Sequence, residues 1–151
     1  MKLTEILSPE CVCVPLEAST KREAIERLIG LLASSGKLTN SAAVLQAVLD
    51  REQIRSTGIG YGLAVPHGKS TAVPSLMMAV GKPAAPIDFG ANDGEPASVI
   101  VLLTSPVDQT GPHIQALARI SRLMLLESFR QAVAETSSAA ELYQVIARHE
   151  T

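Results

Sequence analysis

The feature that most constrains the fold is the strongly apolar segment 97–104, which reads Ala-Ser-Val-Ile-Val-Leu-Leu-Thr. A strand with one solvent-exposed face alternates apolar and polar residues, and the centre of this segment does not alternate. The segment therefore predicts a strand buried on both faces, which requires a sheet covered by helices on each side. It is also far too short to span a bilayer, because a membrane helix needs about 20 apolar residues.

Helix signals lie on both sides of this strand. Thr20–Glu23 and Ser138–Glu141 are capping boxes, in which a hydroxyl and a carboxylate bind free backbone N–H groups at a helix start. Helices are predicted from Thr20 to Gly36, from Asn40 or Ser41 to about Glu52, from Pro112 through Met124 (with Ile114, Leu117 and Ile120 on the same face), over Glu127–Glu135, and after Ser138. Further strands are predicted over Cys11–Leu16, Leu63–Val65 and Leu76–Val80. The predicted fold class is α/β, a mixed sheet flanked by helices, in a single domain 1–151.

Composition narrows the range of functions. The chain has 151 residues, of which 46% are apolar and only 3% are aromatic, and its net charge is −2. With few aromatic rings to stack on bases and no basic run, we expect neither nucleic acid nor an anionic membrane as a partner. The first residues contain no long apolar segment, so they do not form a secretory signal. We therefore expect a cytoplasmic protein with no membrane insertion, and its cysteines, Cys11 and Cys13, to be reduced.

The loop Ser56–Lys69 carries the candidate chemistry. Alternating glycines are followed by a short apolar run and by Pro66, which presents His67 between small residues. The nearest acids in sequence are Glu52 and Asp88, so His67 is poorly placed as a metal ligand. A neutral imidazole has a free lone pair and an ordinary pKa of about 6.5, which suits attack on a phosphoryl group. The residues alone leave open a second interpretation, an ordinary surface histidine in a glycine loop.

No cofactor or metal is expected. The segment Gly62–Ser70 has five residues between its glycines where a phosphate-binding loop has four, and Gly58–Leu63 lacks the small residue that a dinucleotide fingerprint needs. The three histidines, His67, His113 and His149, are too widely spaced for a recognisable metal motif. We expect His149 to be solvated in a frayed C-terminal tail.

Two further residues are candidates for the same site. Arg51 ends a predicted helix just before the loop and offers forked donors for phosphoryl oxygens, unless it is a solvated residue paired with Glu52 or Asp50. His113 lies in the first turn of a helix, where backbone N–H groups favour an anion and the dipole disfavours protonation of the ring. The alternative for His113 is a histidine packed beside Pro112 at the sheet edge.

These residues resemble the enzyme IIA family of the bacterial phosphoenolpyruvate-dependent sugar phosphotransferase system, in its mannitol/fructose class. The resemblance rests on Arg51-Glu52, Ser56–Gly60 and Ala64–His67, with further similarity in Leu3–Glu10 and Lys21–Ile25. It implies a phosphotransferase component in which His67 accepts phosphate from a histidine-containing phosphocarrier protein. It also implies that Arg51 and His113 support the phosphohistidine, and that the phosphoryl group passes to an enzyme IIB cysteine or serves as a regulatory signal.

Within the family, the segments Pro106–His113 and Glu141–Tyr143 look most like the nitrogen-regulatory branch, whose members control partner proteins. The expected function is therefore that of a nitrogen-regulatory enzyme IIA. The alternatives are a sugar-transport enzyme IIA that passes phosphate to an enzyme IIB of a fructose- or mannitol-type permease, and a protein-binding module that is never phosphorylated. In each case we expect a docking face around His67, with Gly68 allowing close approach and Ile59, Leu63 and Val65 forming an apolar surround.

Overall fold

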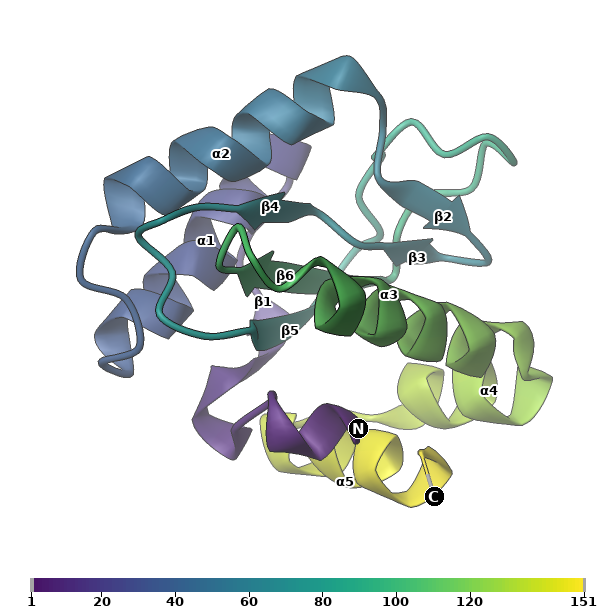
Figure 1. Ribbon diagram of the computed structural model, residues 1–151. Coiled ribbons are helices and arrows are strands. Elements are labelled where there is room, and N and C mark those ends of the chain that lie inside the picture. The colour runs from purple at the N-terminus through teal and green to yellow at the C-terminus, as the bar shows by residue number, and fades with distance from the viewer. Residues whose placement is uncertain (1, 151) are drawn as a thin grey trace.

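The computed structural model describes residues 2–150, and it confirms the predicted α/β fold (Figure 1). The described residues form one six-stranded mixed sheet and five α-helices. The strands are β1 (Val12–Leu16), β2 (Gly58–Gly60), β3 (Leu63–Ala64), β4 (His67–Lys69), β5 (Met77–Pro83) and β6 (Val99–Ser105). The helices are α1 (Lys21–Ser34), α2 (Ser41–Ile54), α3 (Thr110–Leu125), α4 (Glu127–Glu135) and α5 (Ala139–His149), preceded by the 3₁₀ turns η1 (Leu3–Glu5) and η2 (Pro9–Cys11).

Strand β6 is the centre of the sheet. It pairs antiparallel with β5 on one side and parallel with both β3 and β4 on the other, while β1 and β2 form the outer strands. Every residue of β6 is buried. The prediction that the apolar segment is covered on both faces is therefore confirmed.

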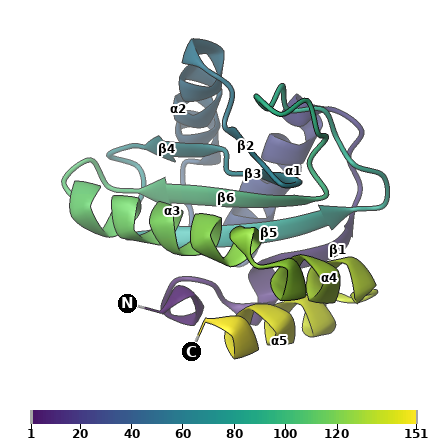
Figure 2. The same cartoon turned by 90° about the vertical axis from the view of Figure 1, so that its right-hand side faces the viewer.

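Helices cover the two faces of the sheet. Figures 1 and 2 show α1 and α2 on one face and α3, α4 and α5 on the other. The turn η1 packs beside α5, where the Glu150 carboxylate accepts hydrogen bonds from the Leu3 N–H (2.5 Å) and the Thr4 hydroxyl (2.6 Å). None of the helices among residues 2–150 is long and apolar enough to cross a membrane.

Both capping boxes form, with one shared variation. The Thr20 hydroxyl accepts a hydrogen bond from the Glu23 N–H (3.2 Å), and the Ser138 hydroxyl accepts one from the Glu141 N–H (3.2 Å). Each glutamate then accepts from the backbone N–H one residue before the cap, that of Ser19 or Ser137. The hydroxyl and N–H of Ser19 hold the pKa of the Glu23 carboxyl group below its ordinary value, and the N–H and hydroxyl of Ser137 do the same for Glu141.

Some local predictions were wrong or incomplete. The segment Ser56–Lys69, predicted as a loop around one strand, also holds the short strands β2 and β4. Helix α3 turns its His113 inward, and Ile114, expected on the apolar face, is 58% exposed. His149 does not lie in a frayed tail: it ends α5, and its ring packs edge-on against Phe129 with 5.3 Å between the ring centroids.

Candidate functional site

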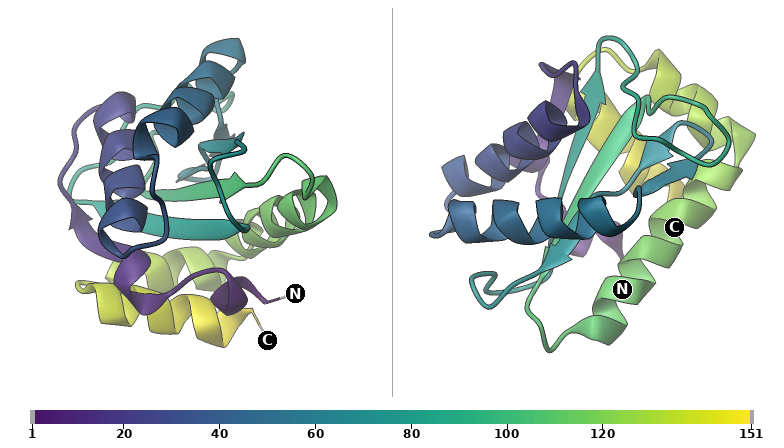
Figure 3. Two further views of the ribbon diagram at one scale, coloured as in Figure 1. Left: turned by 60° about the vertical axis from the view of Figure 1, so that its left-hand side comes forward. Right: turned by 90° about the horizontal axis from the view of Figure 1, so that it is seen from above.

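Pairing of β4 with β6 fixes the position of His67. The chain passes from β3 into β4 alongside β6, where the Leu103 N–H donates to the Pro66 carbonyl (3.0 Å) and His67 pairs with Leu103. Helix α2 lies over β4 on the other side, as the left view of Figure 3 shows. A Cβ atom on Gly68 would lie only 3.1 Å from the backbone nitrogen of Val48 in that helix. His67 therefore sits on a packed strand rather than in a mobile loop.

The environment of His67 defines its tautomer. The ring Nδ1 lies 2.8 Å from the carbonyl oxygen of Val65. A carbonyl oxygen can only accept, so Nδ1 is assigned the hydrogen and Nε2 keeps its lone pair. Burial lowers the pKa of His67, and the positive charges of Arg51 and Lys69 lower it further, against the opposing effects of the Val65 hydrogen bond and Glu52. The ring is therefore neutral near pH 7, with Nε2 available as a nucleophile.

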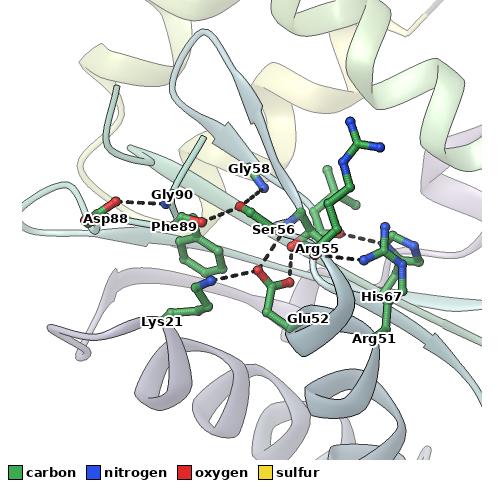
Figure 4. A network of polar contacts seen from close by, with 12 residues as sticks. Lys21, Arg51, Glu52, Arg55, Ser56, Gly58, His67, Asp88, Phe89 and Gly90 are labelled. Carbon is green, nitrogen blue, oxygen red and sulfur yellow. Dashed lines mark hydrogen bonds and ion pairs between the residues drawn. The ribbon is translucent and has the colours of Figure 1, made fainter. Parts of the chain in front are cut away.

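Arg51 lies beside His67 and is not paired as the alternative interpretation expected (Figure 4). Its Nη1 donates to the Arg55 carbonyl at 2.8 Å, which steadies the half-buried side chain. Glu52 instead pairs with Lys21 at 3.0 Å, and Asp50 accepts a hydrogen bond from Gln46 at 2.7 Å. The remaining guanidinium N–H groups of Arg51 can bind an anion next to His67.

His113 reaches the same place from α3. Its ring is buried, and its centroid lies 5.3 Å from that of His67 at an interplanar angle of 64°. Its Nδ1 lies 2.7 Å from the Ser105 hydroxyl, while its buried Nε2 has no hydrogen-bond partner. Burial, followed by the effects of His67 and Lys69, lowers the pKa of His113 to about 4. The ring is neutral as expected from the sequence, but burial and not the helix dipole is the main cause.

The three predicted residues line one pocket of about 380 Å³. Apolar groups from α2 and α3 complete its wall, and none of its lining residues is a carboxylate. The amino group of Lys69 donates to the Thr110 hydroxyl (2.9 Å) at the start of α3 and adds positive charge at the rim. The lining residues are Ala47, Arg51, His67, Gly68, Lys69, His113, Ile114 and Leu117. This arrangement suits an anion of the size and charge of a phosphoryl group.

The expected apolar surround of His67 is partly wrong. Leu63 and Val65 are 1% and 0% exposed, so they belong to the core and offer no docking surface. Ile59 is 48% exposed but is not among the side chains that line the pocket, whereas Ile114 lines it and is exposed. Successive side chains of a strand point to opposite faces of the sheet, and here both faces are covered, so both residues of β3 and the following Val65 are buried.

Sequence reasoning missed Ser105 and considered Glu52 only as a partner of Arg51 and as part of the family motif, not as a residue that binds Thr57. Ser105 is the last residue of β6, so its hydroxyl stands where the chain turns toward His113. Its position at the end of a buried strand was the available signal. Among residues 2–150, no group of three or more His, Cys, Asp or Glu side chains gathers in a way that could hold a metal ion.

The lowered pKa of His113 predicts how stability depends on pH. The unfolded ring takes up a proton near pH 6.5, whereas the folded ring does so only near pH 4. Stability is thus lost as the pH falls through this window, at up to about 1.4 kcal/mol per pH unit, or about 3 kcal/mol in all. Urea unfolding at pH 7 and at pH 4.5 should show a smaller difference for His113→Gln than for the unsubstituted protein. Equal differences would contradict the buried neutral ring.

The chain is similar to known proteins over nearly its whole length. The family model of the phosphoenolpyruvate-dependent sugar phosphotransferase system, EIIA 2, matches residues 5–149. The fructose-specific EIIABC component of Bacillus subtilis is 31% identical over 150 residues, which are 99% of this chain but only 24% of that relative. A nitrogen regulatory protein of Bradyrhizobium diazoefficiens is 32% identical over 149 residues, covering 97% of this chain and 95% of the relative.

A solved structure shares the whole fold. The nitrogen regulatory protein IIA-Ntr from Neisseria meningitidis superimposes with a TM-score of 0.86 at 31% identity, covering 94% of this chain and 97% of that one. The chain spans about a quarter of the Bacillus relative and almost all of the Bradyrhizobium one. The chain therefore belongs to the EIIA type 2 family of the phosphoenolpyruvate-dependent sugar phosphotransferase system, a family of phosphohistidine-carrying phosphotransferase components.

Proposed function

We propose that this protein carries a phosphoryl group on Nε2 of His67, received from a histidine-containing phosphocarrier protein, and acts as a nitrogen-regulatory enzyme IIA in the cytoplasm. The observation that carries the proposal is the neutral His67 ring with Nε2 free, placed in a cationic pocket whose lining includes no carboxylate. Such a site attracts a phosphoryl dianion and leaves a lone pair to attack it.

The transfer balances without a cofactor. The Nε2 lone pair of His67 forms the new P–N bond, and the electron pair of the breaking P–N bond returns to the imidazole of the carrier. The Nδ1 hydrogen stays on His67, so the phosphorylated ring carries a positive charge. The Val65 carbonyl, 2.8 Å from Nδ1, stabilises that charge as it develops. The later loss of the phosphoryl group to a downstream partner reverses these changes.

Arg51 and His113 serve the phosphoryl oxygens in different ways. Arg51 keeps its charge at any relevant pH and supplies the Coulombic attraction. If the Ser105 hydroxyl donates to Nδ1 of His113, Nε2 carries the hydrogen and can donate to a phosphoryl oxygen. The buried, unpartnered Nε2 of His113 then has a partner only when the phosphoryl group is present.

Two downstream roles are possible for a phosphoryl group on His67, and we favour the nitrogen-regulatory one. It is supported by the segment Pro106–His113 and by nearly full-length similarity to proteins named as nitrogen regulatory. The fructose-specific relative favours a second function, transfer of the phosphoryl group to an enzyme IIB of a sugar permease. The two functions share the chemistry at His67 and differ in the partner.

The test is incubation of the protein with labelled phosphoenolpyruvate, enzyme I and the phosphocarrier protein, with and without a metal chelator applied after the carrier is charged. We expect the protein to take up about one phosphoryl group per chain in both conditions. If the carrier becomes charged but the protein takes up no label, both phosphocarrier functions are excluded. The remaining interpretation is then a protein-binding module that is never phosphorylated. Addition of a fructose-type enzyme IIB then separates the two functions, because rapid discharge to it would favour sugar transport over regulation.

Replacement of Arg51 or His113 by alanine should slow the transfer without abolishing it. Loss of one charge-assisted hydrogen bond costs about 1.5–3 kcal/mol, or roughly a tenfold to hundredfold decrease in rate. Rapid-quench measurements should show slow formation or a shortened lifetime of the phosphohistidine in Arg51→Ala, and slow uptake or slow onward transfer in His113→Ala. Arg55→Ala is the matched control, because its carbonyl remains and its side chain does not line the pocket. Wild-type rates in both test variants would remove these residues from the site.

A further inference from the structure

Glu52 is a carboxylate buried next to the pocket but outside its lining. It follows Arg51 in α2 and is 7% exposed. Its two oxygens accept hydrogen bonds from the N–H (3.1 Å) and the hydroxyl of Thr57, and one of them pairs with the amino group of Lys21 at 3.0 Å. A buried charge is costly unless it is paired and hydrogen-bonded, and these contacts meet both conditions. Figure 4 shows Glu52 facing Lys21 beneath the turn that carries Ser56.

The contacts of Glu52 hold the turn 55–57. That turn leaves α2 and enters β2, and Glu52 binds its last residue, Thr57. On its other side the Ser56 hydroxyl donates to the Phe89 carbonyl and accepts from the Gly58 N–H (3.0 Å). Hydrogen bonds therefore hold the turn on two sides, and they fix the positions of its carbonyl groups.

Two of those carbonyl groups accept hydrogen bonds that connect the turn to the site. The Arg55 carbonyl accepts the hydrogen bond of the Arg51 guanidinium at 2.8 Å. The Thr57 carbonyl accepts the Val65 N–H at 2.9 Å, and the carbonyl of the same Val65 accepts Nδ1–H of His67 at 2.8 Å. Glu52 thus holds the residue from which two short routes lead to the site. Hydrogen bonds through Val65 connect Thr57 to His67, and the backbone of residues 55–57 connects it to the carbonyl that binds Arg51.

We infer that Glu52 is a positioning residue for phosphoryl transfer: by holding Thr57 it orients Arg51 and keeps His67 in the Nδ1–H tautomer with Nε2 free. The inference rests on the proposed role of His67 as the phosphoryl acceptor. Lys21 pairs with the buried charge, but the charge of Glu52 still opposes the lowering of the His67 pKa. The Thr57 variants described below leave that charge in place. Misplacement of a reacting group by about 1 Å can cost about a hundredfold in rate, which sets the scale of the effect.

The test compares Glu52→Gln with a matched control, Glu141→Gln. Both carboxylates accept hydrogen bonds from one backbone N–H and one hydroxyl, but Glu141 does so at the start of α5, away from His67. Thr57→Val and Thr57→Ser form a second pair, since valine removes the hydroxyl that reaches Glu52 and serine retains it. This second pair decides the question should Glu52→Gln fail to fold.

Two measurements are made on each variant. Nitrogen-15 NMR of the histidine rings reports the tautomer of His67 with no phosphoryl group present, and rapid quench reports the rate of uptake from the charged carrier. We expect Glu52→Gln and Thr57→Val to populate the second tautomer of His67 and to slow uptake by about 10- to 100-fold. Thr57→Ser and Glu141→Gln should retain the wild-type tautomer and rate.

Each outcome bears on the inference. A folded Glu52→Gln or Thr57→Val variant with the wild-type tautomer and rate would make Glu52 a purely structural residue and overturn the inference. If uptake is slow but the tautomer of His67 is unchanged, the inference that Glu52 acts by orienting His67 is overturned. Should the wild-type protein accept no phosphoryl group, the proposed function fails, whereas the NMR comparison still reports whether Glu52 orients the ring.

Discussion

His67→Ala should abolish uptake of the phosphoryl group from the charged phosphocarrier protein. The substitution removes the nucleophilic nitrogen itself. No other histidine replaces it, because Nε2 of His113 carries the hydrogen in the proposed arrangement and His149 packs against Phe129 outside the pocket. In the unsubstituted protein the label should resist base and be lost in acid, as a phosphoramidate is. Labelling followed by acid and base treatment checks both points.

The matched control for this variant is His149→Asn, which removes a histidine remote from the pocket and should label as the unsubstituted protein does. Circular dichroism of His67→Ala should show an intact fold, since its ring is only half-buried and makes one hydrogen bond. Stoichiometric labelling of His67→Ala would move the acceptor to another residue.

Gly68→Trp should prevent folding rather than merely block docking. Gly68 is buried under α2, and a Cβ atom there would already lie 3.1 Å from Val48 and 3.2 Å from the backbone of Ala47. Added methylene groups in a packed core typically cost about 1–3 kcal/mol, and an indole ring adds far more volume than that. Circular dichroism and urea unfolding should show loss of native structure, or a large decrease in the free energy of unfolding.

The prediction that Gly68 allows close approach of a partner protein is therefore wrong, because its missing side chain faces α2 and allows that helix to approach β4. Ile114→Trp is the matched variant, because this side chain lines the pocket and is 58% exposed. It should keep the fold and slow transfer from the carrier by crowding the pocket. A Gly68→Trp protein with wild-type stability would contradict the packing of α2 on β4.

Several features could be predicted from the sequence because their signals are local or lie in a specific motif. The capping boxes at Thr20 and Ser138 depend on residues three apart, and both form. The buried centre of the sheet follows from the run of apolar residues in β6. The family follows from the residues around Arg51 and His67, and the family model confirms it.

The choice of the buried face of α3 shows where the spacing of apolar residues is not enough to predict the structure. The predicted face, with Ile114 and Leu117, and the observed one, with His113 and Ala116, both include Ile120 and Met124 at helical spacing. Periodicity alone favoured the isoleucine over the histidine as the inward residue. The structure decides for His113, because Ser105 at the end of β6 supplies a hydrogen-bond partner that makes burial of the ring possible.

By itself, the sequence determined the class of fold, the family and the candidate residues His67, Arg51 and His113. Only the tertiary structure decided which of their atoms are free: the Val65 carbonyl selects the tautomer of His67, and the Arg55 carbonyl takes the place of the expected carboxylate partner of Arg51. It also decided that Gly68 serves the packing of α2 and that Glu52 binds the turn before β2. Hydrogen-bond partners and close packing depend on how separate elements meet in space, and spacing along the chain specifies neither.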